Sequence, residues 1–223
     1  MIASLALPPE ITSSQLYAKG GFTLVERLFS EEDLRELQTE ALTARSAAFR
    51  NELAASSEIE EQERGGSPAR AFSSAPGGAV QLRLFRASVV LGWLEQISGA
   101  SVVPTGGGSF TYYERAGDFL SLHRDIATCD LALITCLEET ASSETAGGLL
   151  VYPEYMLEPL SSVHAAGRAS ATPVPLRCGE TIALFGGLVP HEVAGMDPRQ
   201  ERIVSLMCYR ILPAGGSAGA PHR

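Results

Sequence analysis

Short apolar stretches separated by turn residues dominate the chain after Gly106. Alternating apolar and polar positions are typical of strands with one buried face, and closely spaced turns connect antiparallel neighbours. The pattern therefore predicts a mostly β body over about residues 106–212, built as an antiparallel sandwich or barrel. Eight such stretches follow one another: SFTYYERAG, FLSLHRD, LALITCLEE, GGLLVYPE, ATPVPLRCGE, TIALFGG, HEVAG and RIVSLMCYRIL.

The first half of the chain has helical patterns instead. Ser30, with Asp33 three residues later, has the form of a helix N-cap, and Leu37 and Ala41 then recur at helical spacing. We expect this helix to run into the low fifties, after a short strand in GFTLVERLF. A second helix, SVVLGWLEQISG, should end at Gly99.

A polar stretch rich in Ser, Gly, Pro and Glu separates the two helices, at residues 55–78. A loop of this length inside a compact domain is uncommon, so it is either a lid over a site or a plain insertion. We expect one domain over 1–223, with helical support in about 1–105 before the β body and a flexible tail at 213–223.

The chain has 223 residues and a net charge of −9, which argues against a nucleic acid or an anionic membrane as a partner. No apolar stretch approaches the roughly 18 residues of a membrane helix, and the opening MIASLALPPE has no basic leader. We expect a cytoplasmic protein whose four cysteines, none in a CxxC pair, are free thiols: Cys129, Cys136, Cys178 and Cys208. The oligomeric state stays open.

His123 and Asp125 open one of the expected strands, in SLHRD. Side chains two apart in a strand project to the same face, so this pair could share a ligand. A histidine hydrogen-bonded to a nearby aspartate at the end of a strand is the structural alternative.

A third metal-competent residue, His191, follows a strand and a Gly-Gly turn in TIALFGGLVPHEVAG. Two histidines and one carboxylate can occupy one face of a metal octahedron, which is typical of non-haem Fe(II) sites, whereas zinc prefers four ligands. His164, in a loop-like stretch, is the competing third ligand, and His222 in the tail ranks last.

Arg202 begins the last strand, eleven residues after His191. A buried arginine is costly without an anion, and its guanidinium suits a carboxylate. A 2-oxo acid could chelate iron at one end and pair with Arg202 at the other. An ordinary surface arginine is the alternative.

Together these segments resemble the Fe(II)/2-oxoglutarate-dependent oxygenases, and within them the prolyl-4-hydroxylase-like group. The resemblance covers most of the chain: an entry strand and helix in GFTLVERLFSEEDLRELQTEAL, the segment YYERAGDFLSLHRD, the strand GGLLVYPE and the closing block PLRCGETIALFGGLVPHEVAGMDPRQERIVSLMCYR. Each piece alone is weak, whereas their order and spacing are specific.

The resemblance implies a cupin-like jelly roll, the double-stranded β-helix, with helices packed on one side. It implies His123, Asp125 and His191 as Fe(II) ligands, Arg202 as the clamp on 2-oxoglutarate, and Tyr113 as a hydrogen-bonding partner of that cosubstrate. The implied reaction uses O2 and converts 2-oxoglutarate to succinate and CO2 while the substrate is oxidised. Asp125 favours hydroxylation, because halogenating members have Gly or Ala in its place; desaturation, epoxidation and cyclisation stay open.

The chain departs from the family pattern near the clamp. Val204 stands where many relatives have Ser or Thr, and Ser205 would face the other way. Arg199 is close enough in sequence to replace Arg202 as the clamp. Glu138 and Glu139 stand where relatives often show an aromatic residue and Leu-Asn.

The family motifs do not name the substrate, and we expect a small polar metabolite or an amino acid derivative. A protein side chain is the alternative substrate. Two other functions compete: a cupin-like metalloenzyme that does not use 2-oxoglutarate, and a binding or sensing module without chemistry. The candidate substrate-recognition residues are Asp130, Arg83, Arg86 and Arg210.

Overall fold

The computed structural model describes residues 7–54, 64–140 and 147–213. All eight strands expected after Gly106 are present within these ranges. They are β5 (Ser109–Tyr113), β6 (Phe119–His123), β7 (Leu131–Glu139), β8 (Leu149–Val151), β9 (Thr172–Val174), β10 (Thr181–Leu184), β11 (His191–Val193) and β12 (Arg202–Ile211).

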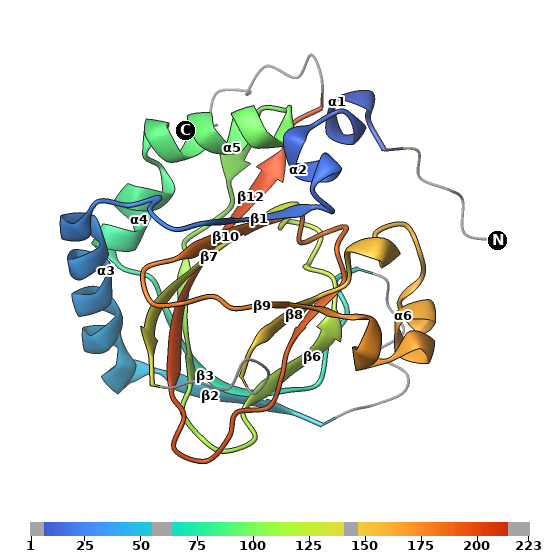
Figure 1. Ribbon diagram of the computed structural model, residues 1–223. Helices are drawn as coiled ribbons and strands as arrows, with labels where there is room; N and C mark the ends of the chain where they lie inside the picture. The colour runs from blue at the N-terminus through green and yellow to red at the C-terminus, as the bar shows by residue number, and fades with distance from the viewer. Residues whose placement is uncertain (1–6, 55–63, 141–146, 214–223) are drawn as a thin grey trace.

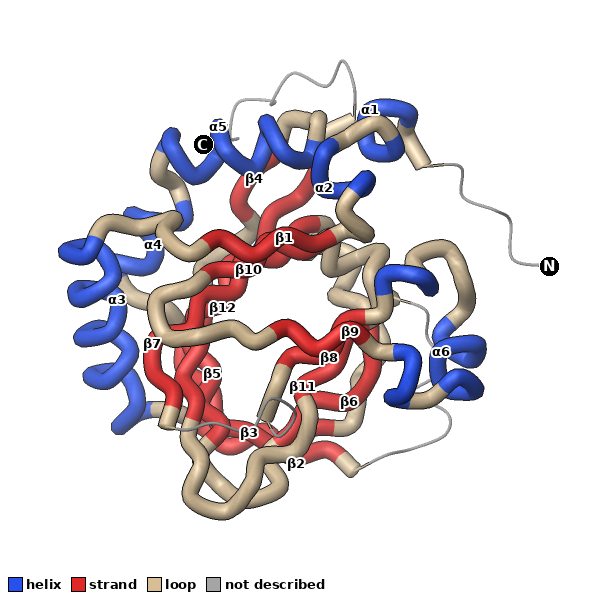
Figure 2. The backbone as a smooth tube through the Cα atoms, in the orientation of Figure 1, coloured by secondary structure: helices blue, strands red, loops and turns tan. Residues whose placement is uncertain are grey.

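These eight strands form two four-stranded layers of one curled antiparallel sheet. One layer has the order β10-β7-β12-β5 and the other the order β6-β11-β8-β9. Successive strands alternate between the layers, except for the neighbours β8 and β9, so the chain winds around a common interior (Figure 2). This winding is the double-stranded β-helix, and the expected jelly roll is confirmed.

Four strands from the first half of the chain join the same sheet. They are β1 (Phe22–Val25), β2 (Phe49–Leu53), β3 (Arg70–Pro76) and β4 (Val102–Pro104). The β1 strand extends one layer beside β10, while β3 pairs with both β5 and β6 and so joins the two layers. The expected division into helical support up to residue 105 and a β core after it is therefore too sharp.

The first long helix is shorter than expected. Helix α3 (Glu31–Ala44) begins at the expected cap, where the Ser30 hydroxyl accepts a hydrogen bond from the Asp33 amide. It ends at Ala44 and is followed by the 3-10 turn η1 (Arg45–Ala47) and by β2. The prediction of helix into the low fifties is wrong because all of β2 pairs with β3, and this long-range pairing overrides local helix propensity.

The polar stretch 55–78 is not one continuous loop. Residues 70–76 form β3, and residues 55–63, the centre of the expected flap, lie outside the described residues. The composition of AFSSAP gives no local indication of a strand. The strand is defined by its pairing with β2 and β5, which come from other parts of the sequence. The tail beyond residue 213 also lies outside the described part of the chain.

Helices cover the outer face of the layer that contains β12 (Figure 1). Helix α5 (Ser88–Ser98) was expected and ends at Gly99 with a left-handed backbone, whereas α4 (Ala79–Phe85) was not expected. No helix in the described segments is both long and apolar enough to cross a membrane. The remaining helical segments are α1 (Pro9–Thr12), α2 (Gln15–Ala18), η2 (Pro153–Tyr155), α6 (Leu160–Ala166) and η3 (Arg168–Ser170).

The two faces of β12 separate the helical core from the barrel interior. On the outer face, the Tyr209 hydroxyl donates to the Phe85 carbonyl, and the buried Ser205 hydroxyl accepts from Gln81. On the inner face, Arg202, Val204 and Leu206 line a cavity. Both faces are buried over most of the strand, which explains why apolar residues stand on both of them.

The expectation of four free thiols is wrong for one pair. A disulfide joins Cys129, just before β7, to Cys208 on β12. Cys136 is buried and free, and Cys178 is exposed and free. Sequence spacing gave no signal for the bond, because strand pairing brings together cysteines that are 79 residues apart. The prediction of a cytoplasmic location therefore loses the support of free thiols.

The disulfide should contribute measurably to stability. The variant Cys208→Ser is expected to lower the free energy of unfolding by about 4 kcal/mol, because the bond closes a long loop in the unfolded chain. Urea unfolding measures this difference, with Cys178→Ser as the matched control that should leave stability unchanged. Equal stability of wild type and Cys208→Ser would show that the bond does not form in solution.

Candidate metal site and cavity

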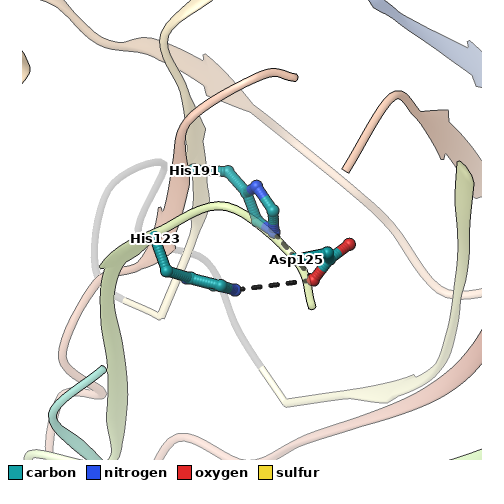
Figure 3. Close-up of side chains that lie close together, drawn as sticks. All are labelled: His123, Asp125 and His191. Carbon is teal, nitrogen blue, oxygen red and sulfur yellow. Dashed lines mark ion pairs between the residues drawn. The ribbon is translucent and has the colours of Figure 1, made fainter. Parts of the chain in front are cut away.

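His123 and His191 face each other across two neighbouring strands. His123 ends β6, His191 begins β11, and the two residues are direct partners in the antiparallel register. Their ring centroids are 4.2 Å apart. Asp125 follows β6 by two residues, and Figure 3 shows both rings directed toward its carboxylate. Strand register therefore assembles the two parts of the expected triad, which are far apart in sequence.

The three side chains present their ligand atoms to one point. Nε2 of each histidine lies 3.7 Å from Oδ1 of Asp125, and the three ligand atoms lie within 4.8 Å of one another. Each Nδ1 is 2.8–2.9 Å from a backbone carbonyl, that of Ser121 or that of Val189, so Nδ1–H can donate there. That contact leaves the Nε2 lone pair free for a cation.

The electrostatics of the triad fit a cation at its centre. Burial, followed by the nearby His123, lowers the pKa of His191 to about 4, so its imidazole is neutral at physiological pH. Burial alone would raise the pKa of Asp125, but the close approach of His123, with His191 and Arg64 nearby, outweighs burial and lowers that pKa. The buried Oδ2 of Asp125 has no hydrogen-bond partner among the described residues. Such an orphaned oxygen requires an explanation, and a metal ion supplies one.

Arg124, between His123 and Asp125, points away from the triad. It is buried, and its guanidinium donates to the carbonyls of Leu188 at 2.7 Å, Tyr155 at 2.9 Å and Glu158 at 2.6 Å. These contacts tie the His-x-Asp segment to the loop that leads into His191 and to the segment at and after η2.

Two residues that sequence reasoning did not assign support the Asp125 loop. The Asp125 amide donates to the Gly186 carbonyl at 2.8 Å, and a Cβ on Gly186 would lie 1.8 Å from Oδ2 of Asp125. Arg64 donates to the carbonyls of Asp125 and Cys129 and to the carboxylate of Asp130. The Gly-Gly turn before His191 indicated a special backbone position at Gly186. Arg64 lies in the polar stretch, where nothing in the sequence indicated its role.

The triad forms part of the wall of a cavity inside the barrel, and Arg202 also lines this cavity. Tyr113 and Thr111 of β5 add polar groups. The rest of the lining is apolar and includes Phe72, Leu120, Ile134, Leu149, Leu176 and Val193. Sequence reasoning did not identify these apolar residues, because they look like ordinary core positions.

Arg202 is only 7 % exposed and lies next to Tyr113 and Glu139 through direct strand pairing. Its Nη1 donates to the carbonyl of Gly147 at 2.6 Å, and its Nη2 contacts the Glu139 carboxylate. Its Nε is buried without a hydrogen-bond partner in the described part of the chain. Burial raises the pKa of Tyr113, so its phenol is protonated and can donate.

Several alternatives that the sequence left open lie away from this cavity. Arg199 is exposed, in a turn with a positive φ of 71°. His164 is exposed on α6, a helix rather than the expected loop, and is not part of the triad. Ser205 faces the helices, as its position next to Val204 indicated. His222 lies outside the described residues.

The four candidate substrate-recognition residues do not line the cavity. Arg83 forms ion pairs with Asp33 and Glu36 on the outer surface, and Arg86 is exposed after α4. Asp130 accepts hydrogen bonds from Arg64 and from the amide of Ile211. Arg210 shares strand parity with Arg202, but it is exposed where β12 pairs with β4 beyond the cavity.

No family model and no curated protein sequence matches the chain. Solved structures do match over most of both chains. A prolyl hydroxylase from Trichoplax adhaerens, in complex with a peptide of the hypoxia inducible factor oxygen degradation domain, has a TM-score of 0.60 at 13% identity and covers 87% of this chain and 86% of its own.

Two further structures match at a similar level. EctD from S. alaskensis with bound Fe has a TM-score of 0.63 at 18% identity and covers 94% of this chain and 80% of its own. The non-heme alpha ketoglutarate dependent epimerase SnoN from nogalamycin biosynthesis has a TM-score of 0.62 at 16% identity, with coverages of 93% and 90%. The chain thus shares the fold of these proteins.

Proposed function

We propose that the protein is an Fe(II)- and 2-oxoglutarate-dependent oxygenase that hydroxylates its substrate. One observation carries the proposal: two histidines, a carboxylate with an orphaned oxygen and a buried arginine share one cavity. The names of the structural neighbours, which include a prolyl hydroxylase, an Fe-bound protein and an alpha ketoglutarate dependent enzyme, support the same chemistry.

In this proposal His123, Asp125 and His191 hold Fe(II). Two imidazoles and one carboxylate leave positions for other ligands on a six-coordinate iron, whereas a structural zinc site would be closed by a fourth protein ligand. Bound iron supplies the activation of O2, of which one atom enters succinate and the other enters the substrate as a hydroxyl group, with loss of CO2 from 2-oxoglutarate.

The remaining polar groups orient 2-oxoglutarate. Arg202 pairs with the distal carboxylate, because a guanidinium with a buried, unpartnered Nε can donate to an anion there. Tyr113 lies beside Arg202 and donates its phenolic proton to the same cosubstrate. The apolar walls exclude water, which strengthens both interactions.

The lining of the cavity favours a substrate that is partly apolar rather than the small polar one expected from the sequence. The candidate residues for a polar substrate lie outside the cavity, whereas it is lined by Leu120 and Val193, on the two strands that carry the histidines, and by Phe72 on the neighbouring β3. We propose a small organic metabolite with an apolar portion. A peptide side chain is the alternative, since one structural neighbour holds a peptide.

A metalloenzyme that does not use 2-oxoglutarate is the second candidate function. The contact between Arg202 and Glu139 favours it, because this arginine already has a carboxylate partner within the chain. Such an enzyme would keep the triad and would not need an external dicarboxylate.

Calorimetric titration of the Fe(II)-loaded protein under argon distinguishes the two functions. The oxygenase proposal predicts that 2-oxoglutarate binds one per chain, and that glutarate, which lacks the chelating 2-oxo group, binds much more weakly. Iron binding without any heat from 2-oxoglutarate would favour the second candidate.

The close approach of Gly186 to Asp125 gives a test of the metal site that leaves its ligands unchanged. The variant Gly186→Ala should weaken Fe(II) binding by about 10- to 100-fold, because the added Cβ displaces the Asp125 carboxylate. Gly92→Ala is the matched control, since a Cβ there meets no atom within 4 Å. Competition with a chromophoric chelator measures the affinity, and equal affinity for Gly186→Ala and wild type would contradict the proposed role of Asp125.

A further inference from the structure

Glu139 stands directly beside the arginine that would hold the cosubstrate. It is the last residue of β7, and the antiparallel register pairs it with Arg202, the first residue of β12. Directly opposed residues project to the same side of a sheet, so the two side chains meet. The neighbouring Glu138 pairs with Ile203, whose side chain lies on the other face.

The contact occupies the nitrogen that carboxylate recognition needs most. A guanidinium binds a carboxylate bidentately through two adjacent nitrogens, and both possible pairs, Nε with Nη2 and Nη1 with Nη2, include Nη2. In Arg202 the Glu139 carboxylate contacts Nη2, and Nη1 donates to the Gly147 carbonyl. Only Nε is without a hydrogen-bond partner among the described residues.

Two carboxylates at one guanidinium repel each other, most strongly next to an apolar wall. The two members of the ion pair differ in their freedom to respond. The Arg202 side chain is 8% exposed, whereas the Glu139 side chain is 24% exposed and lies at the end of its strand. An incoming dicarboxylate would therefore displace Glu139 toward solvent and leave Arg202 in place.

We propose that Glu139 is a built-in competitor of the cosubstrate's distal carboxylate. It pairs with Arg202 while the cavity holds no dicarboxylate, and 2-oxoglutarate must displace it in order to bind. The residue therefore lowers the affinity for 2-oxoglutarate. It leaves the affinity for monocarboxylic 2-oxo acids unchanged, so the ratio between the two affinities becomes smaller. This inference rests on the proposed function.

The test compares anaerobic dissociation constants of 2-oxoglutarate for the Fe(II)-loaded protein and two variants. Glu139→Gln keeps the size of the side chain and an acceptor for Nη2 but removes the charge, so it should bind 2-oxoglutarate about 10-fold more tightly. Glu138→Gln, its neighbour on the other face, should bind as the wild type does. The affinity for 2-oxobutyrate, which has no distal carboxylate, should be the same in all three proteins.

Unchanged or weaker binding of 2-oxoglutarate by Glu139→Gln would overturn the inference and make Glu139 a residue that only orients Arg202. If that variant does not fold, Glu139→Asp, which keeps the charge but shortens the reach, should show a smaller gain, and no gain would overturn the inference. Failure of the proposed function is distinguishable, because the wild type itself would then not bind 2-oxoglutarate.

Discussion

Replacing His123 with alanine is expected to weaken Fe(II) binding by more than about 100-fold, since even groups that only support a metal ligand contribute about 10- to 100-fold. His123 supplies one of three converging ligand atoms, and its Nε2 lies 3.7 Å from the Asp125 carboxylate. Anaerobic competition with a chromophoric chelator measures the affinity.

His164→Ala is the matched control for this experiment. The residue is the other histidine that the sequence offered as a ligand, and it is exposed on α6. Its replacement should leave iron affinity unchanged. Wild-type affinity in His123→Ala, or a loss of affinity in His164→Ala, would contradict the assigned ligand set.

Replacing Arg202 with glutamine is expected to weaken 2-oxoglutarate binding by roughly 100-fold, or about 2 to 3 kcal/mol, because a buried charge pair is lost. Iron affinity should be unchanged, since Arg202 is not one of the three residues of the triad whose ligand atoms converge. Binding of 2-oxobutyrate should also be unchanged, because it has no distal carboxylate. Calorimetry with each acid on the Fe(II)-loaded protein measures both effects.

Arg199→Ala is the matched control for Arg202. The sequence alone left both arginines as candidates for the clamp, and Arg199 is exposed in a turn outside the cavity. Its replacement should not change the affinity for 2-oxoglutarate. An equal loss in both variants would indicate a general effect of charge rather than a specific clamp.

The β body could be predicted well from the sequence, because the pattern that indicates each of its strands is local. All eight strands after Gly106 carry apolar stretches bounded by turn residues, and each stretch can be recognised without its partner. The first half was predicted less well, because β2 and β3 are defined mainly by pairing with each other and with β5 and β6. Local composition could not show that residues 49–53 leave the helix to form a strand.

The residues of the candidate site also fall into two groups, those that a local motif indicates and those that depend on contacts between distant segments. His123 and Asp125 form a local motif, and His191 follows a recognisable turn, so the sequence identified a group that the fold brings together. The contributions of Arg64, Gly186 and Glu139 depend on contacts between distant segments. The candidate substrate-recognition residues were chosen from charge and position in the sequence, which do not show where a side chain lies; Arg83, for example, forms ion pairs with surface carboxylates outside the cavity.

The most direct test of the central claim is the visible spectrum of the Fe(II)-loaded protein under argon, recorded before and after addition of 2-oxoglutarate. Chelation of a 2-oxo acid by iron is expected to give a weak charge-transfer band, and the band should be diminished in Arg202→Gln at the same concentration. A protein that binds iron but shows no band with 2-oxoglutarate would contradict the oxygenase proposal and favour a metalloenzyme that does not use this cosubstrate.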